Sequence, residues 1–138
     1  MKSGTWRTRR PVGCNAVPSA VRALRGATTV DADEPDHLTE RVNTLVLEML
    51  DRNAVAKADI ISVLFTATSD IHCKFPATAT RTIGLGDVPL ICAQELDIVG
   101  ATARCIRVMM HLNTERTPQE LHHVYLEGAR GLNDDLPA

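Results

Sequence analysis

The sequence has few aromatic residues and no long apolar run. Only Trp6, Phe65, Phe75 and Tyr125 are aromatic among 138 residues. No segment approaches the roughly 18 consecutive apolar residues of a membrane-spanning helix, so we expect none. Hydrophobic residues make up 44% of the chain and charged residues 23%, which is typical of a globular protein. The length predicts a single domain.

The chain also lacks a large excess of charge of either sign. Fifteen basic and seventeen acidic residues give a net charge of −2, which argues against a nucleic-acid-binding protein. The basic residues Lys2, Arg7, Arg9 and Arg10 lie in a segment without acidic residues, periodicity or the apolar stretch of a signal peptide. We therefore expect residues 1–18 to form a disordered basic tail and residues 19–138 to form the folded domain.

Closely spaced metal ligands and nucleophile motifs are missing as well. The cysteines stand at positions 14, 73, 92 and 105 without a CxxC pair, which suggests neither a zinc ribbon nor a disulfide framework. Reduced cysteines predict a cytoplasmic protein. There is no glycine-rich phosphate loop, GxSxG or HExxH motif. The adjacent His122 and His123 are interpreted as surface residues of a helix that cannot share one metal.

Hydrophobic patterning predicts an α+β or α/β domain with a mixed β-sheet and helices packed on one face. A single apolar stripe predicts a helix over 36–53. The capping box Thr117-Pro118-Gln119-Glu120 predicts another helix to about Glu127, followed by a short terminal strand. The segment 25–29 is expected to be a turn. A short helix is expected over 77–83, and strands are expected over 20–24, 60–68, 88–92 and 105–112.

The most informative charged residue is Arg107, in the middle of an expected strand. Every second residue of this strand is apolar and forms a core face: Ile106, Val108, Met110 and Leu112. Arg107 stands between them in the sequence and therefore lies on the opposite face. A desolvated guanidinium must find an anion, because leaving it unpaired is costly. The residues alone leave two partners open, a ligand or an ion pair across a subunit interface. A partner subunit is the natural cover for this face.

Five blocks resemble, in order and spacing, the AroH-type monofunctional chorismate mutases. They are RGATT (25–29), FPATATR (75–81), VPLICAQELD (88–97), RCIRVMMH (104–111) and HHVYLEGA (122–129). The resemblance implies a homotrimer of α+β subunits around a barrel-like core, with active sites at subunit interfaces. It implies rearrangement of chorismate to prephenate in phenylalanine and tyrosine biosynthesis, without a metal, a cofactor, a covalent intermediate or acid–base catalysis.

The resemblance also assigns catalytic roles. Arg107 matches the arginine that donates to the ether oxygen of the substrate and to a carboxylate. Glu95 matches the carboxylate that accepts from the ring hydroxyl, and Cys92 matches a cysteine near that hydroxyl. Arg25 and Tyr125 match a carboxylate-binding pair.

Further positions match residues that line the site. Phe75, Ala77 and Arg81 match lining positions expected from the neighbouring subunit. Ile91 and Leu132 match positions whose backbone or bulk matters more than their chemistry.

The chain departs from the family pattern at two positions. Thr78 stands where many members have lysine, and Asn133 stands where they usually have arginine. Both differences remove positive charge near the mouth of a site for a dianion. We therefore expect activity to be kept and substrate capture to be weaker.

Two other functions remain open on the residues. One is a trimer that binds other small acids without mutase activity, as in the similarly shaped YjgF/Rid group. The other is a structural assembly protein in which Arg107 forms an interface ion pair. Loss of chorismate absorbance on adding the protein would indicate a mutase and would argue against both alternatives.

Overall fold

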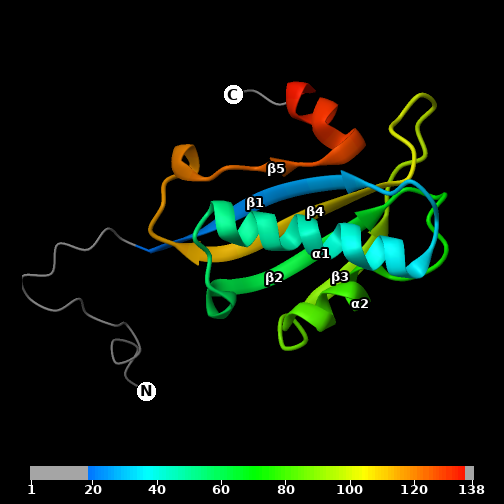
Figure 1. The fold of residues 1–138 in the computed structure, drawn as a ribbon. Coiled ribbons are helices and arrows are strands. Elements are labelled where there is room, and N and C mark those ends of the chain that lie inside the picture. Colours follow the sequence, from blue (N-terminus) through cyan, green and yellow to red (C-terminus); the bar gives the residue numbers. More distant parts are fainter. Residues whose placement is uncertain (1–18, 136–138) are drawn as a thin grey trace, which may run out of the picture.

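A single five-stranded sheet organises the domain in the computed structural model, which describes residues 19–135 (Figure 1). The strand order is β3-β2-β4-β1-β5. β4 pairs antiparallel with β1 and β2, whereas the outer strands β3 and β5 run parallel to their neighbours. The strands are β1 (Ala20–Thr29), β2 (Ile60–Ala67), β3 (Leu90–Gln94), β4 (Cys105–Thr114) and β5 (Val124–Tyr125). This mixed sheet with its helices confirms the predicted α+β class.

The main helix, α1 (Pro35–Arg52), lies along one face of the sheet (Figure 1). Its start is fixed by Glu34, whose carboxylate accepts from the backbone N–H groups of Asp36 and His37 at 3.1 and 2.8 Å. The stripe identified from the sequence is the buried one: Leu38, Val42, Leu45, Val46, Met49 and Leu50. The apolar spacing therefore gave the helix to within one residue at each end.

A shorter helical segment covers the sheet beside α1. α2 (Pro76–Ala79) runs directly into a 3₁₀ helix, Thr80–Ile83, which ends at Gly84 with a φ of 87°. A left-handed residue at this place favours glycine. The expected helix over 77–83 is confirmed in place, but its second half has the tighter 3₁₀ geometry.

The opposite face of the sheet is largely without a helix in the described part of the chain. Ile106, Val108, Met110 and Leu112 of β4 are buried toward α1, as the alternation predicted. Arg107 and Met109 therefore belong to the other face. Only the C-terminal 3₁₀ helix, Glu127–Asp135, reaches it, through Ala129 and Leu132. We call this surface the open face.

Three expectations about local structure are wrong. The segment 25–29 is not a turn, because β1 pairs with β4 over all ten of its residues, from Ala20↔Thr114 to Thr29↔Cys105. The capping box at Thr117 is present, but it begins only the 3₁₀ turn Pro118–Glu120. The chain is already extended at Leu121, so His122 and His123 precede β5 instead of lying on a helix.

The C-terminal segment also differs from the expected strand, because it forms the 3₁₀ helix Glu127–Asp135. The first strand begins at Ala20, close to the expected start of the domain. The expected tail, residues 1–18, lies outside the described residues. No helix in the described range has the length and apolarity needed to cross a membrane.

Candidate active site

A hollow of about 210 Å³ on the open face brings four of the predicted site residues together. Arg25 comes from β1, Arg107 from β4, Tyr125 from β5, and Glu95 follows β3 directly. Residues that were not predicted as site residues complete the lining: Gly26, Leu64, Thr66, Val108 and Met109.

Strand register places these side chains in one row across the sheet. Arg107 is paired with Thr66 of β2 on one side and with Ala27 of β1 on the other. Ala27 is in turn paired with Tyr125 of β5. Paired residues share a face, so Thr66, Arg107, Ala27 and Tyr125 all face the same way. The small side chain of Ala27 leaves space between the guanidinium and the phenol.

Glu95 is held beside Arg107 by β2. Its Oε2 lies 3.3 Å from Nε of Arg107 and accepts a hydrogen bond of 2.5 Å from the hydroxyl of Thr66. Its backbone N–H donates to the carbonyl of Ala67 at 2.9 Å. Thr66 therefore orients the carboxylate, a role that sequence reasoning missed. The available signal was a hydroxyl residue on the Arg107 face of an otherwise apolar strand.

Two polar atoms in this hollow have no hydrogen-bond partner. Nε of Arg107 and the hydroxyl of Tyr125 are both buried and unpartnered in the described structure. Desolvation raises the pKa of Tyr125, although the charges of Arg25 and Arg107 oppose this rise. The phenol therefore stays protonated at neutral pH and can donate. Unpartnered buried donors cost about 1–3 kcal/mol each, and a ligand with acceptor oxygens removes that cost.

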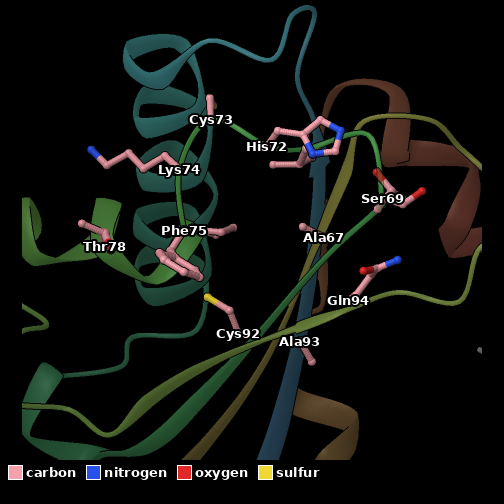
Figure 2. A pocket seen from close by; sticks show the side chains of 13 residues that line it. Ala67, Ser69, His72, Cys73, Lys74, Phe75, Thr78, Cys92, Ala93 and Gln94 are labelled. Carbon is pink, nitrogen blue, oxygen red and sulfur yellow. The ribbon is translucent and has the colours of Figure 1, made fainter.

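A second hollow, of about 610 Å³, lies on the other side of β3 (Figure 2). Phe75 and Cys92 lie side by side in its wall, with the sulfur of Cys92 directed at the Phe75 ring. Cys92 is paired with Phe65 in the β2–β3 register and so faces the α1 side of the sheet. Within one protomer, the structure therefore does not bring Cys92 to Glu95 and Arg107.

The remaining predicted residues are spread between these two regions. Ile91 is 65% exposed and is paired with Leu64, on the open face. Leu132, like Tyr125, packs against the small cluster of the buried residues Ala27, Cys105 and Ala129. Ala77 lies in α2, partly buried against the core, and Arg81 is exposed on the following 3₁₀ helix.

A carboxylate clamp fixes the loop that carries Phe75. Asp33 accepts from the backbone N–H groups of His72 (3.1 and 3.0 Å to its two oxygens) and Cys73 (3.0 Å). A hydrogen bond from the Cys73 thiol, followed by these backbone bonds, lowers the pKa of Asp33. Desolvation, followed by the hydrogen bond to Asp33 and its charge, raises the pKa of Cys73 to about 11. The described residues contain no group of three or more His, Cys, Asp or Glu side chains that could hold a metal.

The chain is similar to known proteins of one family. A family model described as chorismate mutase type I matches residues 21–136. The protein named chorismate mutase AroH from Bacillus subtilis (strain 168) is 38% identical over 117 residues, which span 84% of this chain and 92% of the relative. The protein of the same name from Thermus thermophilus is 39% identical over 117 residues, or 84% and 96% of the two chains. The solved structure of a chorismate mutase from Clostridium thermocellum matches with a TM-score of 0.78 and 42% identity, over 80% of this chain and 98% of that one. By the extent of these matches, the chain belongs to the type I chorismate mutase family.

Proposed function

We propose that this chain converts chorismate to prephenate at a site shared by two copies. It forms where the open face of one copy meets the β3 edge of another, with Phe75 beside that edge. Chorismate mutase activity, an isomerase step of aromatic amino acid biosynthesis, is the activity of its family. The observation that carries the proposed mechanism is the buried, unpartnered Nε of Arg107 beside Glu95 in the open-face hollow.

The reaction is an intramolecular rearrangement, so the site has to orient and stabilise instead of supplying a nucleophile. Chorismate carries two carboxylates and a ring hydroxyl, and it reacts from a compact conformer that brings its two reacting carbons together. As the ether bond breaks, negative charge develops on its oxygen and positive charge on the ring. Fixed donors and acceptors directed at those charges lower the barrier.

The open-face hollow has the groups that this chemistry needs. The guanidinium of Arg107 donates to the ether oxygen and to a carboxylate, while Glu95 accepts from the ring hydroxyl and faces the developing positive charge. Arg25 and the protonated Tyr125 bind the carboxylates. Two guanidinium groups and one carboxylate leave a net positive charge, which suits an anionic substrate.

One protomer supplies only part of the enclosure. The hollow of about 210 Å³ is smaller than the roughly 300–1,000 Å³ of typical small-molecule sites. Cys92 and Phe75 face away from it and belong to the other hollow. We propose that a neighbouring copy supplies Phe75, Ala77 and Arg81. We place Cys92 at the same junction, beside the ring hydroxyl.

Exposed apolar side chains support an assembly of like copies. Around the β3 edge and the loop after it, five large apolar residues are exposed by 62–101%: Phe75, Ile91, Leu96, Ile98 and Val99. An apolar surface of this kind is typical of an interface. We propose a homotrimer with a barrel-like core, a closed assembly in which every open face meets a neighbour's β3 edge. We expect it in the cytoplasm, where its cysteines stay reduced.

Two measurements test this proposal. Purified protein should consume chorismate, followed by the loss of its diene absorbance, and light scattering should give a trimer. Subunit mixing then tests the shared site, using Arg107→Ala and Phe75→Ala proteins that are each impaired. Random exchange in a trimer creates about one intact site in four, so kcat/KM of the mixture should exceed the mean of the two. No gain after verified exchange, or a monomer at micromolar concentration, would contradict the interfacial site.

A further inference from the structure

We infer that His123 is a positioning residue for the open-face hollow, because its neutral ring accepts a hydrogen bond from the backbone of Arg25 and so sets Arg25 against Tyr125. The inference rests on the proposed function for its kinetic consequence, since both neighbours are assigned to the substrate carboxylates. The hydrogen bond itself runs from the Arg25 N–H to Nδ1 of His123 and measures 3.0 Å.

Tyr125 stands on an unusually short strand. β5 consists of Val124 and Tyr125 alone, paired with Gly26 and Ala27. After the strand, the N–H of Leu126 donates to the carbonyl of Ala27 at 2.9 Å. A two-residue strand has too few ladder bonds to fix its own register, so contacts at its ends decide where Tyr125 lies.

The contact at the start of the strand is unusual because a side chain replaces a backbone acceptor. A continued parallel ladder would present a backbone carbonyl to the Arg25 N–H. The carbonyl of His122 instead accepts from the side-chain amide of Asn53 at 2.8 Å, and the His122 N–H donates to the same side chain at 2.6 Å. Asn53 is buried at the end of α1. Because the backbone of His122 is bonded to Asn53 at the end of α1, the Arg25 N–H donates to the ring of His123 instead.

The arrangement requires a neutral ring with its proton on Nε2, since only an unprotonated Nδ1 can accept. Partial desolvation of the ring, followed by the charges of Arg25 and His122, lowers the pKa of His123. Arg25 on β1 and His122 on the same segment are the titratable groups that act on the ring, and both oppose its protonation. At the end of α1, the side chain that bonds this segment is the uncharged amide of Asn53. The surroundings therefore favour the acceptor form at neutral pH.

Three substitutions separate this role from simple packing. In His123→Asn, Oδ1 takes the place of Nδ1 and can accept from Arg25, whereas His123→Gln moves its oxygen one bond further and His123→Ala has none. We expect kcat/KM of His123→Asn within about threefold of wild type. His123→Ala and His123→Gln should lose about tenfold or more, mainly through KM, because Arg25 and Tyr125 bind the substrate. His122→Ala is the matched control, since the hydrogen bonds of His122 to Asn53 use only its backbone.

A nitrogen NMR spectrum of the wild-type ring gives a readout that is independent of activity. We predict the Nε2–H tautomer at pH 7.5, with Nδ1 unprotonated. A protonated Nδ1, a His123→Ala protein with wild-type KM, or a His123→Asn protein as impaired as His123→Ala would each overturn the inference. If the wild-type protein fails to consume chorismate, the proposed function is wrong, while the tautomer still decides whether the hydrogen bond exists.

Discussion

Nε of Arg107 lies 3.3 Å from Oε2 of Glu95, although the two residues belong to segments separated by β2. The pair is only partly exposed, with 42% of the Arg107 side chain and 22% of the Glu95 side chain accessible to solvent. Each charge therefore helps to orient the other. Nε makes an ion pair with Glu95 but no hydrogen bond within the described structure, so its N–H is available to an acceptor on a substrate.

The first prediction concerns Thr66, whose hydroxyl donates to Oε2 of Glu95. Thr66→Val should lower kcat/KM about tenfold, because a lost hydrogen bond to a charged group costs about 1.5 kcal/mol or more. Thr66→Ser keeps the hydroxyl and should stay within about threefold. Steady-state kinetics on both variants, at matched thermal stability, measure the difference. Equal activities would show that the hydroxyl does not position the carboxylate.

The second prediction concerns the missing positive charge at Thr78, which lines the hollow with Phe75 (Figure 2). Thr78→Lys, alone or with Asn133→Arg, should lower KM by roughly two- to fivefold at low salt and change kcat little. Added positive charge acts mainly on capture of a dianion, and salt screens it. The control Gln119→Lys adds the same charge at an exposed position outside either hollow. An unchanged KM at low salt would place Thr78 away from the mouth.

The third prediction uses the Asp33 clamp. With a pKa of about 11, the Cys73 thiol should react with iodoacetamide at pH 8 more slowly than an ordinary exposed cysteine. Asp33→Asn removes the negative charge beside the thiol and should speed the modification of Cys73 by at least about threefold. Peptide mass spectrometry resolves the sites, and Cys92 serves as the internal reference. Fast labelling of Cys73 in the wild-type protein would contradict the clamp.

The fourth prediction concerns stability at mildly acid pH. The pKa of His123 is lowered in the fold from its usual 6.5, so between these two values the unfolded chain binds more protons. The free energy of unfolding should therefore fall as pH drops through 6.5 toward the folded pKa. Asp33 and Glu34, whose lowered pKa values start from 3.8 and 4.5, add a loss only at lower pH.

Urea unfolding from pH 7.5 to 5, at one protein concentration, isolates the histidine contribution. His123→Asn cannot gain a proton there, so the stability advantage of wild type over His123→Asn should shrink as pH falls. An advantage that is constant over this range would mean that His123 titrates alike in the folded and unfolded chain.

Local patterns in the sequence predict what depends on one element alone. The spacing of apolar residues from Leu38 to Leu50 predicted α1. The alternation of apolar and polar residues around Arg107 predicted the two faces of β4. The full length of β1 depends on non-local pairing with β4, which carries the strand through Gly26 and the residues after it. The capping box at Thr117 did not propagate a helix, because Asn53 and β1 hold the following residues extended.

Of the candidate site, the sequence pattern alone predicted only one residue. Arg107 stood out as a charge in an apolar strand, whereas grouping Arg25, Glu95 and Tyr125 with it required the family resemblance. Strand parity already separates Cys92 from Glu95, because residues three apart in an extended chain face opposite ways. The roles of Thr66 and His123 depend on register and on contacts between distant segments, which no local pattern contains.

The most direct test of the account is the turnover of folded, assembled Arg107→Ala protein. The positive charge of Arg107 is directed at an oxygen that becomes negative only as the ether bond breaks. Loss of the arginine therefore affects the transition state more than the bound substrate. We predict that kcat falls by about 10²–10³-fold, and that Arg107→Lys restores little because a point charge cannot replace the planar guanidinium. Arg52→Ala, which removes an arginine paired with Glu48 on α1, is the control and should keep wild-type kcat. Wild-type turnover in an assembled Arg107→Ala trimer would contradict the mechanism proposed for this site.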